Sequence, residues 1–220
     1  MATGSTARRI DDSPALEVKR PGFGGGDPPV PPIRPNAAVG NNAWLAVLML
    51  LGAEAMFFAG LIGAYLVFRI GSAMWPPPFQ PRLPLAVTGV NTIILLASAL
   101  TMRGAVKAVH RGNLTLSIRQ LGITSALGAF FLTIQGFEWV RLIHFGLTLS
   151  SSVYGGLFYT LIGFHAFHVV VGLIWLLIVL LLAKKGRWSD RRYVGVQTCA
   201  MYWTFVVALW PVLYGLVYLY

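Results

Sequence analysis

Two acids and two histidines are the side chains of this sequence whose type and position favour chemistry. Glu54 and Glu138 lie inside long apolar stretches, whereas the other acids lie near the N-terminus or in a polar connection. His165 and His168 are three residues apart, so on a helix they share one face. Carboxyl and imidazole groups exchange protons, hydrogen-bond to each other and bind metal ions. These four residues are therefore the first candidates for a site.

The depth of each acid within its stretch gives it a different interpretation. Glu54 is about 11 residues into an apolar stretch, or roughly 16 Å at 1.5 Å per residue, close to the midplane of a bilayer. An ionisable group at that depth is costly, so we favour a proton-carrying role over that of a buried structural acid. Glu138 lies near a stretch end, between Gln135 and Arg141. A functional role and a lipid or interface contact are equally good interpretations there.

The histidine pair allows three interpretations. A haem held by two histidines normally takes its ligands from opposing helices, and no other histidine lies deep in an apolar stretch. A metal site built from His165, His168 and Glu54 would have an incomplete shell. The favoured interpretation is hydrogen-bonded packing that includes a proton-linked contact between a histidine and Glu54. We expect no catalytic residue and no cofactor or metal bound by this chain.

Composition identifies the elements that must position these residues. Of the 220 residues, 56% are apolar and 11% are charged, and the mean hydropathy is +0.70. A soluble domain carries about 25% charged residues, so a soluble enzyme, a nucleic-acid-binding domain and a disordered chain are excluded. Each of five apolar stretches has roughly the 20 residues that a membrane span needs, and none alternates with a period of two. The sequence predicts an all-α integral membrane bundle with spans at about 43–68, 84–102, 119–141, 153–183 and 193–220.

The basic residues orient this bundle. All of the lysines and arginines except Arg69, Arg82 and Arg141 fall before the first span or in the second and fourth connections. Positive residues stay on the cytoplasmic side, which predicts an N-terminus inside and a C-terminus outside. The net charge of +10 is thus explained by topology, and we expect no nucleic-acid partner. Residues 1–42 are rich in Pro and Gly and predict an extended or disordered cytoplasmic arm before the domain at 43–220.

Further residues have the character of packing and interface groups. Gly155, Gly163 and Gly172 of the fourth stretch allow close approach of neighbouring helices, and Asn91 adds a polar packing contact. Trp75 and Arg69 suit the membrane interface. The sequence also contains a series of short motifs that these interpretations do not explain.

These motifs run through the chain in a fixed order. They are E-x-M-F-F-A-G from Glu54, W-P-P from Trp75, N-T-x-x-L-L-A-S from Asn91, Q-x-x-E-W from Gln135, Y-G from Tyr154, G-F-H-x-x-H-V-x-x-G from Gly163 and Y-W-x-F-V from Tyr202. In this combination the chain resembles the cytochrome c oxidase subunit III family of the haem-copper terminal oxidases, in its five-helix bacterial form.

The resemblance implies a multi-pass subunit of an aerobic respiratory oxidase in the bacterial inner membrane, without a redox centre of its own. It implies partners that include the catalytic subunit I, with its haem and copper, and the other oxidase subunits. It also implies phospholipids in a cleft of the bundle, stabilisation of the catalytic subunit and support of proton uptake. Glu54 matches the family's buried carboxylate, Glu138 its second acid, and His165 and His168 its histidine pair.

The last span departs from the family pattern. The family reads Y-W-H-F-V-D, whereas Thr204 stands here for the His and Val207 for the Asp. This argues against a conducting Glu–His–Asp network and leaves His165, His168 and Thr204 as candidate partners of Glu54. An accessory subunit of a nitric-oxide reductase or a quinol oxidase is the nearest alternative. A free-standing proton channel or transporter is the alternative of a different class, although the sequence has no inverted repeat.

Overall fold

The computed structural model describes residues 37–75, 77, 84–185 and 190–219, and these residues form one compact helical unit. All five long helices are of sufficient length and apolar character to cross a membrane, and the described residues contain no strand. The predicted all-α, five-span architecture is therefore confirmed. The elements are α1 (Ala37–Gly71), α2 (Leu85–His110), α3 (Leu114–His144), α4 (Val153–Lys184), α5 (Asp190–Tyr214) and a final π-helical turn, η1 (Gly215–Leu219).

Several helices are longer than the sequence predicted. α1 begins at Ala37, inside the segment assigned to the arm, and the rest of that arm, residues 1–36, lies outside the described residues. α2 continues to His110 instead of ending at 102, so Arg103 and Lys107 are helical and not part of a connection. Its 26 residues span about 39 Å at 1.5 Å per residue, more than the roughly 30 Å of the hydrocarbon core. Helices extend in this way because long basic side chains reach water from the head-group region.

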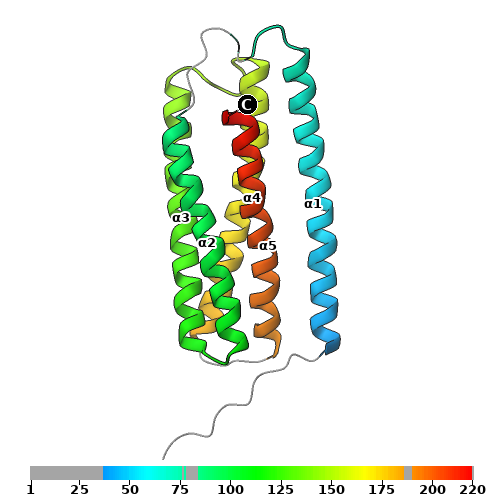
Figure 1. Ribbon diagram of the computed structural model, residues 1–220, viewed down its shortest axis with the longest axis vertical. Helices are drawn as coiled ribbons and strands as arrows, with labels where there is room; N and C mark the ends of the chain where they lie inside the picture. The colour runs from blue at the N-terminus through cyan, green and yellow to red at the C-terminus, as the bar shows by residue number, and fades with distance from the viewer. Residues whose placement is uncertain (1–36, 76, 78–83, 186–189, 220) are drawn as a thin grey trace, which may run out of the picture. The chain divides into compact units, whose positions relative to one another are not determined.

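The α2–α3 connection is a short turn with its own capping groups. Gly112 has a φ of +71°, a left-handed conformation that glycine adopts without the cost a Cβ would bring. The Asn113 side chain then accepts a hydrogen bond from the Leu116 amide at 3.0 Å and caps α3. The connection is therefore confined to residues 111–113, and α2 and α3 run antiparallel (Figure 1).

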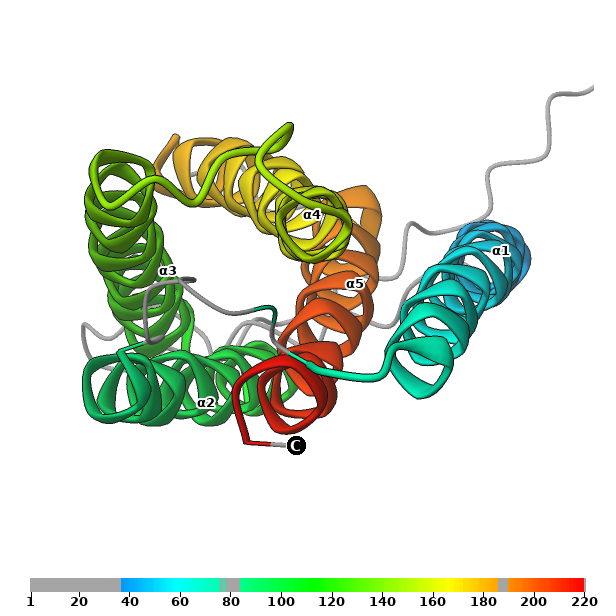
Figure 2. The same cartoon turned by 90° about the horizontal axis from the view of Figure 1, so that it is seen from above.

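The antiparallel order places the start of α1, the α2–α3 turn and the end of α4 at one end of the bundle (Figure 1). Seen along the helices, α2, α3, α4 and α5 surround a common interior, and α1 lies outside it beside α5 (Figure 2). Only 11% of the most apolar stretch of α1 is buried, against 28% to 39% in the other four spans. α1 is thus a peripheral helix that presents most of its apolar surface outward.

Two tryptophans of α5 fill the interior. Trp203 and Trp210 are fully buried, and their indole N–H groups donate to Ser98 Oγ at 3.1 Å and to Thr92 Oγ1 at 2.8 Å on α2. Trp203 fits because Gly128 of α3 has no side chain: a Cβ there would lie 2.6 Å from the Trp203 ring. Large rings are therefore accommodated by a small residue and fixed by hydroxyl acceptors.

Candidate functional site

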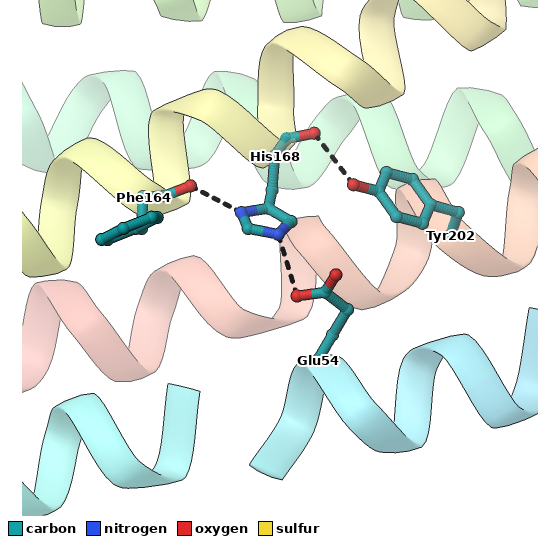
Figure 3. Close-up of polar contacts among 4 residues, drawn as sticks. All are labelled: Glu54, Phe164, His168 and Tyr202. Carbon is teal, nitrogen blue, oxygen red and sulfur yellow. Dashed lines mark hydrogen bonds and ion pairs between the residues drawn. The ribbon is translucent and has the colours of Figure 1, made fainter. Parts of the chain in front are cut away.

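Glu54 of α1 points toward the ring of His168 on α4 (Figure 3). The carboxyl Oε2 lies 2.8 Å from His168 Nε2, which is the distance of a strong hydrogen bond. The two residues are 114 positions apart in the chain and meet because α1 lies against α4 and α5. The structure therefore makes His168 the partner of Glu54 among the three candidates that the sequence left open.

The other ring nitrogen of His168 determines how many protons this contact holds. Nδ1 lies 2.6 Å from the carbonyl oxygen of Phe164, one helical turn earlier (Figure 3). A carbonyl only accepts, so Nδ1 carries a hydrogen and donates it. One further proton then lies between Nε2 and Glu54. It makes the pair either a carboxylic acid with a neutral imidazole or a carboxylate with an imidazolium, and both forms have a net charge of zero.

The pair lies at the edge of the protein interior. The side chain of Glu54 is 21% exposed and that of His168 is 10% exposed. They line a groove of about 310 Å³ together with Ala53, Phe57 and two phenylalanines of α4, Phe164 and Phe167. A net-neutral polar pair with aromatic walls is an arrangement that an apolar surrounding tolerates, because charge is not left uncompensated.

His165 does not take part in this contact. It is buried, and its ring stacks on Trp210 of α5 at a centroid distance of 5.0 Å. Neither of its ring nitrogens has a hydrogen-bond partner among the described residues. The phenyl ring of Phe58 lies beside both histidines, at 6.4 Å from His165 and 5.2 Å from His168. The two histidines thus have different environments despite their helical spacing.

Thr204 is also separate from the pair. It lines a second groove, of about 470 Å³, between α1, α2 and α5, whose other lining residues are Trp44, Leu51, Val106, Gln197, Ala200 and Met201. Val207, at the other departure from the family pattern, is buried in the core. From α5 it is Tyr202 that reaches the site, with a long hydrogen bond of 3.4 Å from its hydroxyl to the carbonyl oxygen of His168.

Glu138, for which a functional role and a lipid or interface contact were equally good interpretations, and Gln135 are buried in the interior of the bundle. Only 4% of Glu138 and 3% of Gln135 is exposed, and the Gln135 amide donates to the hydroxyl of Tyr218 at 3.3 Å. Arg141 is exposed, and its guanidinium lies 5.7 Å from the centre of the Phe145 ring. Gln135 and Glu138 are buried because they continue the face of α3 that carries buried Phe131.

Arg69 and Trp75 connect the end of α1 to the rest of the bundle. Arg69 Nη1 donates to the carbonyl oxygen of Leu216 in η1 at 3.1 Å. The Trp75 indole donates to the Tyr65 hydroxyl at 3.3 Å and packs edge-on against Tyr154 of α4. These contacts fix the end of the peripheral helix, and through it the register of Glu54.

The residues expected in helix packing have distinct surroundings. A Cβ on Gly172 would lie 3.1 Å from Trp203, and one on Gly155 would collide with the carbonyl oxygen of Thr148. Gly163 has open space around it and lines a surface groove with Tyr159, Thr160, Phe164 and Phe167. The Asn91 amide donates to the carbonyl oxygen of Phe131 at 3.1 Å and joins α2 to α3.

Sequence reasoning missed the Phe164 carbonyl, Tyr202 and Tyr218. Phe164 is four residues before His168, and this spacing alone would have identified its carbonyl as an acceptor. The roles of Tyr202 and Tyr218 depend on how α5 and η1 rotate against α3 and α4, which no local pattern encodes. Among the described residues, no three His, Cys, Asp or Glu side chains gather as a metal site would require.

Comparison with known proteins gives one consistent family. The family model described as cytochrome c oxidase subunit III matches residues 34–220. The chain is 37% identical over 174 residues to the cytochrome c oxidase subunit 3 of Synechocystis sp., covering 79% of this chain and 73% of the relative. It is 37% identical over 188 residues to the probable cytochrome c oxidase subunit 3 of Nocardia farcinica, covering 84% of this chain and 89% of the relative. The cytochrome c oxidase subunit 3 of Corynebacterium diphtheriae is 35% identical over 182 residues, covering 81% of this chain and 88% of the relative. The chain therefore belongs to the cytochrome c oxidase subunit III family.

Proposed function

We propose that this chain is the non-catalytic subunit III of a haem-copper respiratory oxidase in the bacterial inner membrane, with its N-terminus inside. It packs with the other oxidase subunits against the catalytic subunit I, which carries the haem and copper. The observation that carries this proposal is the family match over residues 34–220, which includes all five spans. The basic residues in the last turns of α2 and α4, Lys107 and Lys184, support the orientation, because both turns lie at the end of the bundle where α1 starts (Figure 1).

The peripheral position of α1 supports a structural role in such a complex. Large apolar side chains of α1, among them Met49, Met56, Val67 and Ile70, are more than two-thirds exposed. A helix that turns this much apolar surface outward in a membrane contacts lipid chains or another transmembrane helix. The two grooves beside α1, one at Glu54 and one at Thr204, have mostly apolar linings and are sites for the acyl chains of phospholipids.

The Glu54–His168 pair supports proton uptake by the catalytic subunit. It holds one proton within a single short hydrogen bond, and either partner can carry the charge of that proton. Such a pair accepts or releases a proton with little movement of heavy atoms. Its partial exposure at the α1–α4 groove gives the proton a way to a neighbouring subunit or to bound water.

The test is purification of the affinity-tagged chain in mild detergent, followed by an optical spectrum and a subunit analysis. We expect it to elute with a haem-containing catalytic subunit, and the purified complex to consume oxygen. Elution alone and free of haem would contradict the proposal and favour a transporter. A complex that reduces nitric oxide but not oxygen would identify a reductase accessory subunit instead.

A second experiment separates the structural role from the proton role. Glu54→Ala should leave the haem content of the complex unchanged, while proton uptake slows or activity decays sooner during turnover. Met56→Ala, an exposed substitution on the same helix, is the matched control and should retain wild-type turnover. Loss of haem from the assembled Glu54→Ala complex would show that Glu54 acts on the redox centre and not on protons.

A further inference from the structure

A second polar cluster lies inside the ring formed by α2, α3, α4 and α5. It consists of Thr88 of α2, Gln135 and Glu138 of α3 and Tyr218 of η1, and we refer to it as the interior cluster. Its exposed fractions are 1% for Thr88, 3% for Gln135, 4% for Glu138 and 7% for Tyr218. The Tyr218 hydroxyl accepts the Gln135 amide at 3.3 Å and also lies close to the side chains of Thr88, Tyr154 and Glu138. The four side chains therefore share one small region at the end of the bundle where η1 lies.

Three buried polar atoms of the interior cluster have no hydrogen-bond partner within the described part of the chain. They are Thr88 Oγ1, Gln135 Oε1 and Glu138 Oε2. Two neighbouring side chains of the same interior share this condition, because Asn91 Oδ1 and both ring nitrogens of His165 are also unpartnered. More than nine in ten buried polar groups in folded proteins have a partner, either in the protein or in ordered water. A concentration of such atoms in one interior therefore points to a bound ligand that supplies the bonds.

The donor and acceptor balance of the cluster defines that ligand. Gln135 Oε1 can only accept. The Tyr218 hydroxyl accepts from Gln135 and keeps its own hydrogen to donate, and the Thr88 hydroxyl can do both. Glu138 Oε2 accepts when ionised and donates or accepts when protonated. A ligand that satisfies all of these groups must be small, uncharged, and able to donate and accept at the same time.

We propose that the interior cluster is a binding site for ordered water. At least one water molecule donates to Gln135 Oε1 and bonds to Glu138 Oε2, and the bonded chain continues to the Thr88 hydroxyl. Buried water molecules typically make about three such bonds each to otherwise unpartnered groups. Bound water gives Glu138 Oε2 a hydrogen-bond partner, which the described protein groups do not provide.

This site is separate from the Glu54–His168 pair. The pair opens on the groove between α1 and α4, whereas the interior cluster lies on the opposite side of α4, within the ring of helices. Phe158 of α4 lies 6.0 Å from the Tyr218 ring, and Trp210 lies 6.4 Å from it. These aromatic side chains form the wall of the cluster on the side of α4 and α5. The chain thus contains two distinct carboxyl sites that differ in their access to the surroundings.

The decisive experiment is an electron cryo-microscopy structure of the purified, complete complex at a resolution that shows ordered water elsewhere in the protein. We expect a density peak within hydrogen-bonding distance of both Gln135 Oε1 and Glu138 Oε2 in the wild type. Direct side-chain contacts that leave no room for such a peak would overturn the proposal. A peak with the short oxygen distances of a metal ion would also overturn it.

Two variants assign the water to these residues. Thr88→Val keeps the shape of the side chain and removes its hydroxyl, so the end of the water chain at Thr88 should disappear. Glu138→Leu should remove the bridging peak, and where this variant fails to assemble, Glu138→Gln, which retains bonding groups, should assemble and keep the peak. Thr133→Val is the matched control, because the Thr133 hydroxyl is bonded to the Ala129 carbonyl on an exposed face of α3. Unchanged density in both Thr88→Val and Glu138→Leu would contradict the assignment.

Discussion

Glu54 of α1 and His168 of α4 are joined by one hydrogen bond of 2.8 Å. The other ring nitrogen of His168, Nδ1, donates to the carbonyl oxygen of Phe164 at 2.6 Å and fixes the orientation of the ring. The contact is therefore a polar link between α4 and the peripheral helix. Most of α1 is otherwise exposed, so few other side chains compete for the role of holding the two helices in register.

The linking role of the pair and its proposed proton role respond to different substitutions. His168→Ala should destabilise the assembled chain by about 1–3 kcal/mol, because it leaves Glu54 without its partner in a poorly hydrated groove. Glu54→Gln should retain most of the stability, since an amide donates to or accepts from Nε2 in either protonation state. Thermal unfolding of the purified complex measures the first effect, and proton uptake during turnover measures the second. Equal stability of the His168→Ala complex and the wild type would show that the contact does not hold α1.

Close packing of α3 against α5 predicts a sharp difference between two glycines of one helix. Gly128→Ala places a Cβ 2.6 Å from the Trp203 ring, and overpacking of this kind costs about 1–3 kcal/mol. Gly122→Ala meets no atom within 4 Å and should be neutral or slightly stabilising, because alanine favours a helix. The midpoint of thermal unfolding of the two variants distinguishes them. A Gly128→Ala complex that melts with wild-type behaviour would show that Trp203 can move aside.

The number and type of the elements could be predicted from the sequence, because spans of apolar residues and basic connections are local patterns. Helix ends were less predictable, as α2 shows, since hydropathy fails to mark where a helix leaves the hydrocarbon region. The spacing of His165 and His168 predicted a shared helix face, yet only His168 meets Glu54, whereas His165 stacks on Trp210. The side that Glu138 faces depends on the rotation of α3 against η1, which a depth argument does not address.

The indole of Trp210 links α5 to α2 through a single polar contact, the 2.8 Å hydrogen bond to Thr92 Oγ1. Trp210→Phe should remove this bond and the stacking with His165, with a loss of about 1–3 kcal/mol from the bond and from the volume no longer filled. Val212→Ala, at an exposed position of the same helix, is the control and should change the unfolding midpoint little. Equal midpoints for the two variants would mean that the core relaxes around the smaller ring.

The two departures from the family pattern on α5 predict opposite outcomes when the family residues are restored. Thr204 borders a groove of about 470 Å³ and is only partly buried, so Thr204→His should be accommodated with little change in stability. Because Thr204 is not among the hydrogen-bond partners of Glu54 and His168, the restored histidine should also leave the dependence of proton uptake on Glu54 unchanged. Val207→Asp is different: the position is 1% exposed, and an unpaired polar group there costs about 2–7 kcal/mol.

The assembly yield and unfolding midpoint of the Thr204→His, Val207→Asp and double variants show whether positions 204 and 207 interact. If the family's histidine and aspartate depend on each other, Thr204→His should rescue Val207→Asp. We expect no rescue, because Val207 is buried in the core and an aspartate there loses its hydration whichever residue stands at position 204. The double variant should therefore be as unstable as Val207→Asp alone, and a double variant close to the wild type would show that the two positions interact.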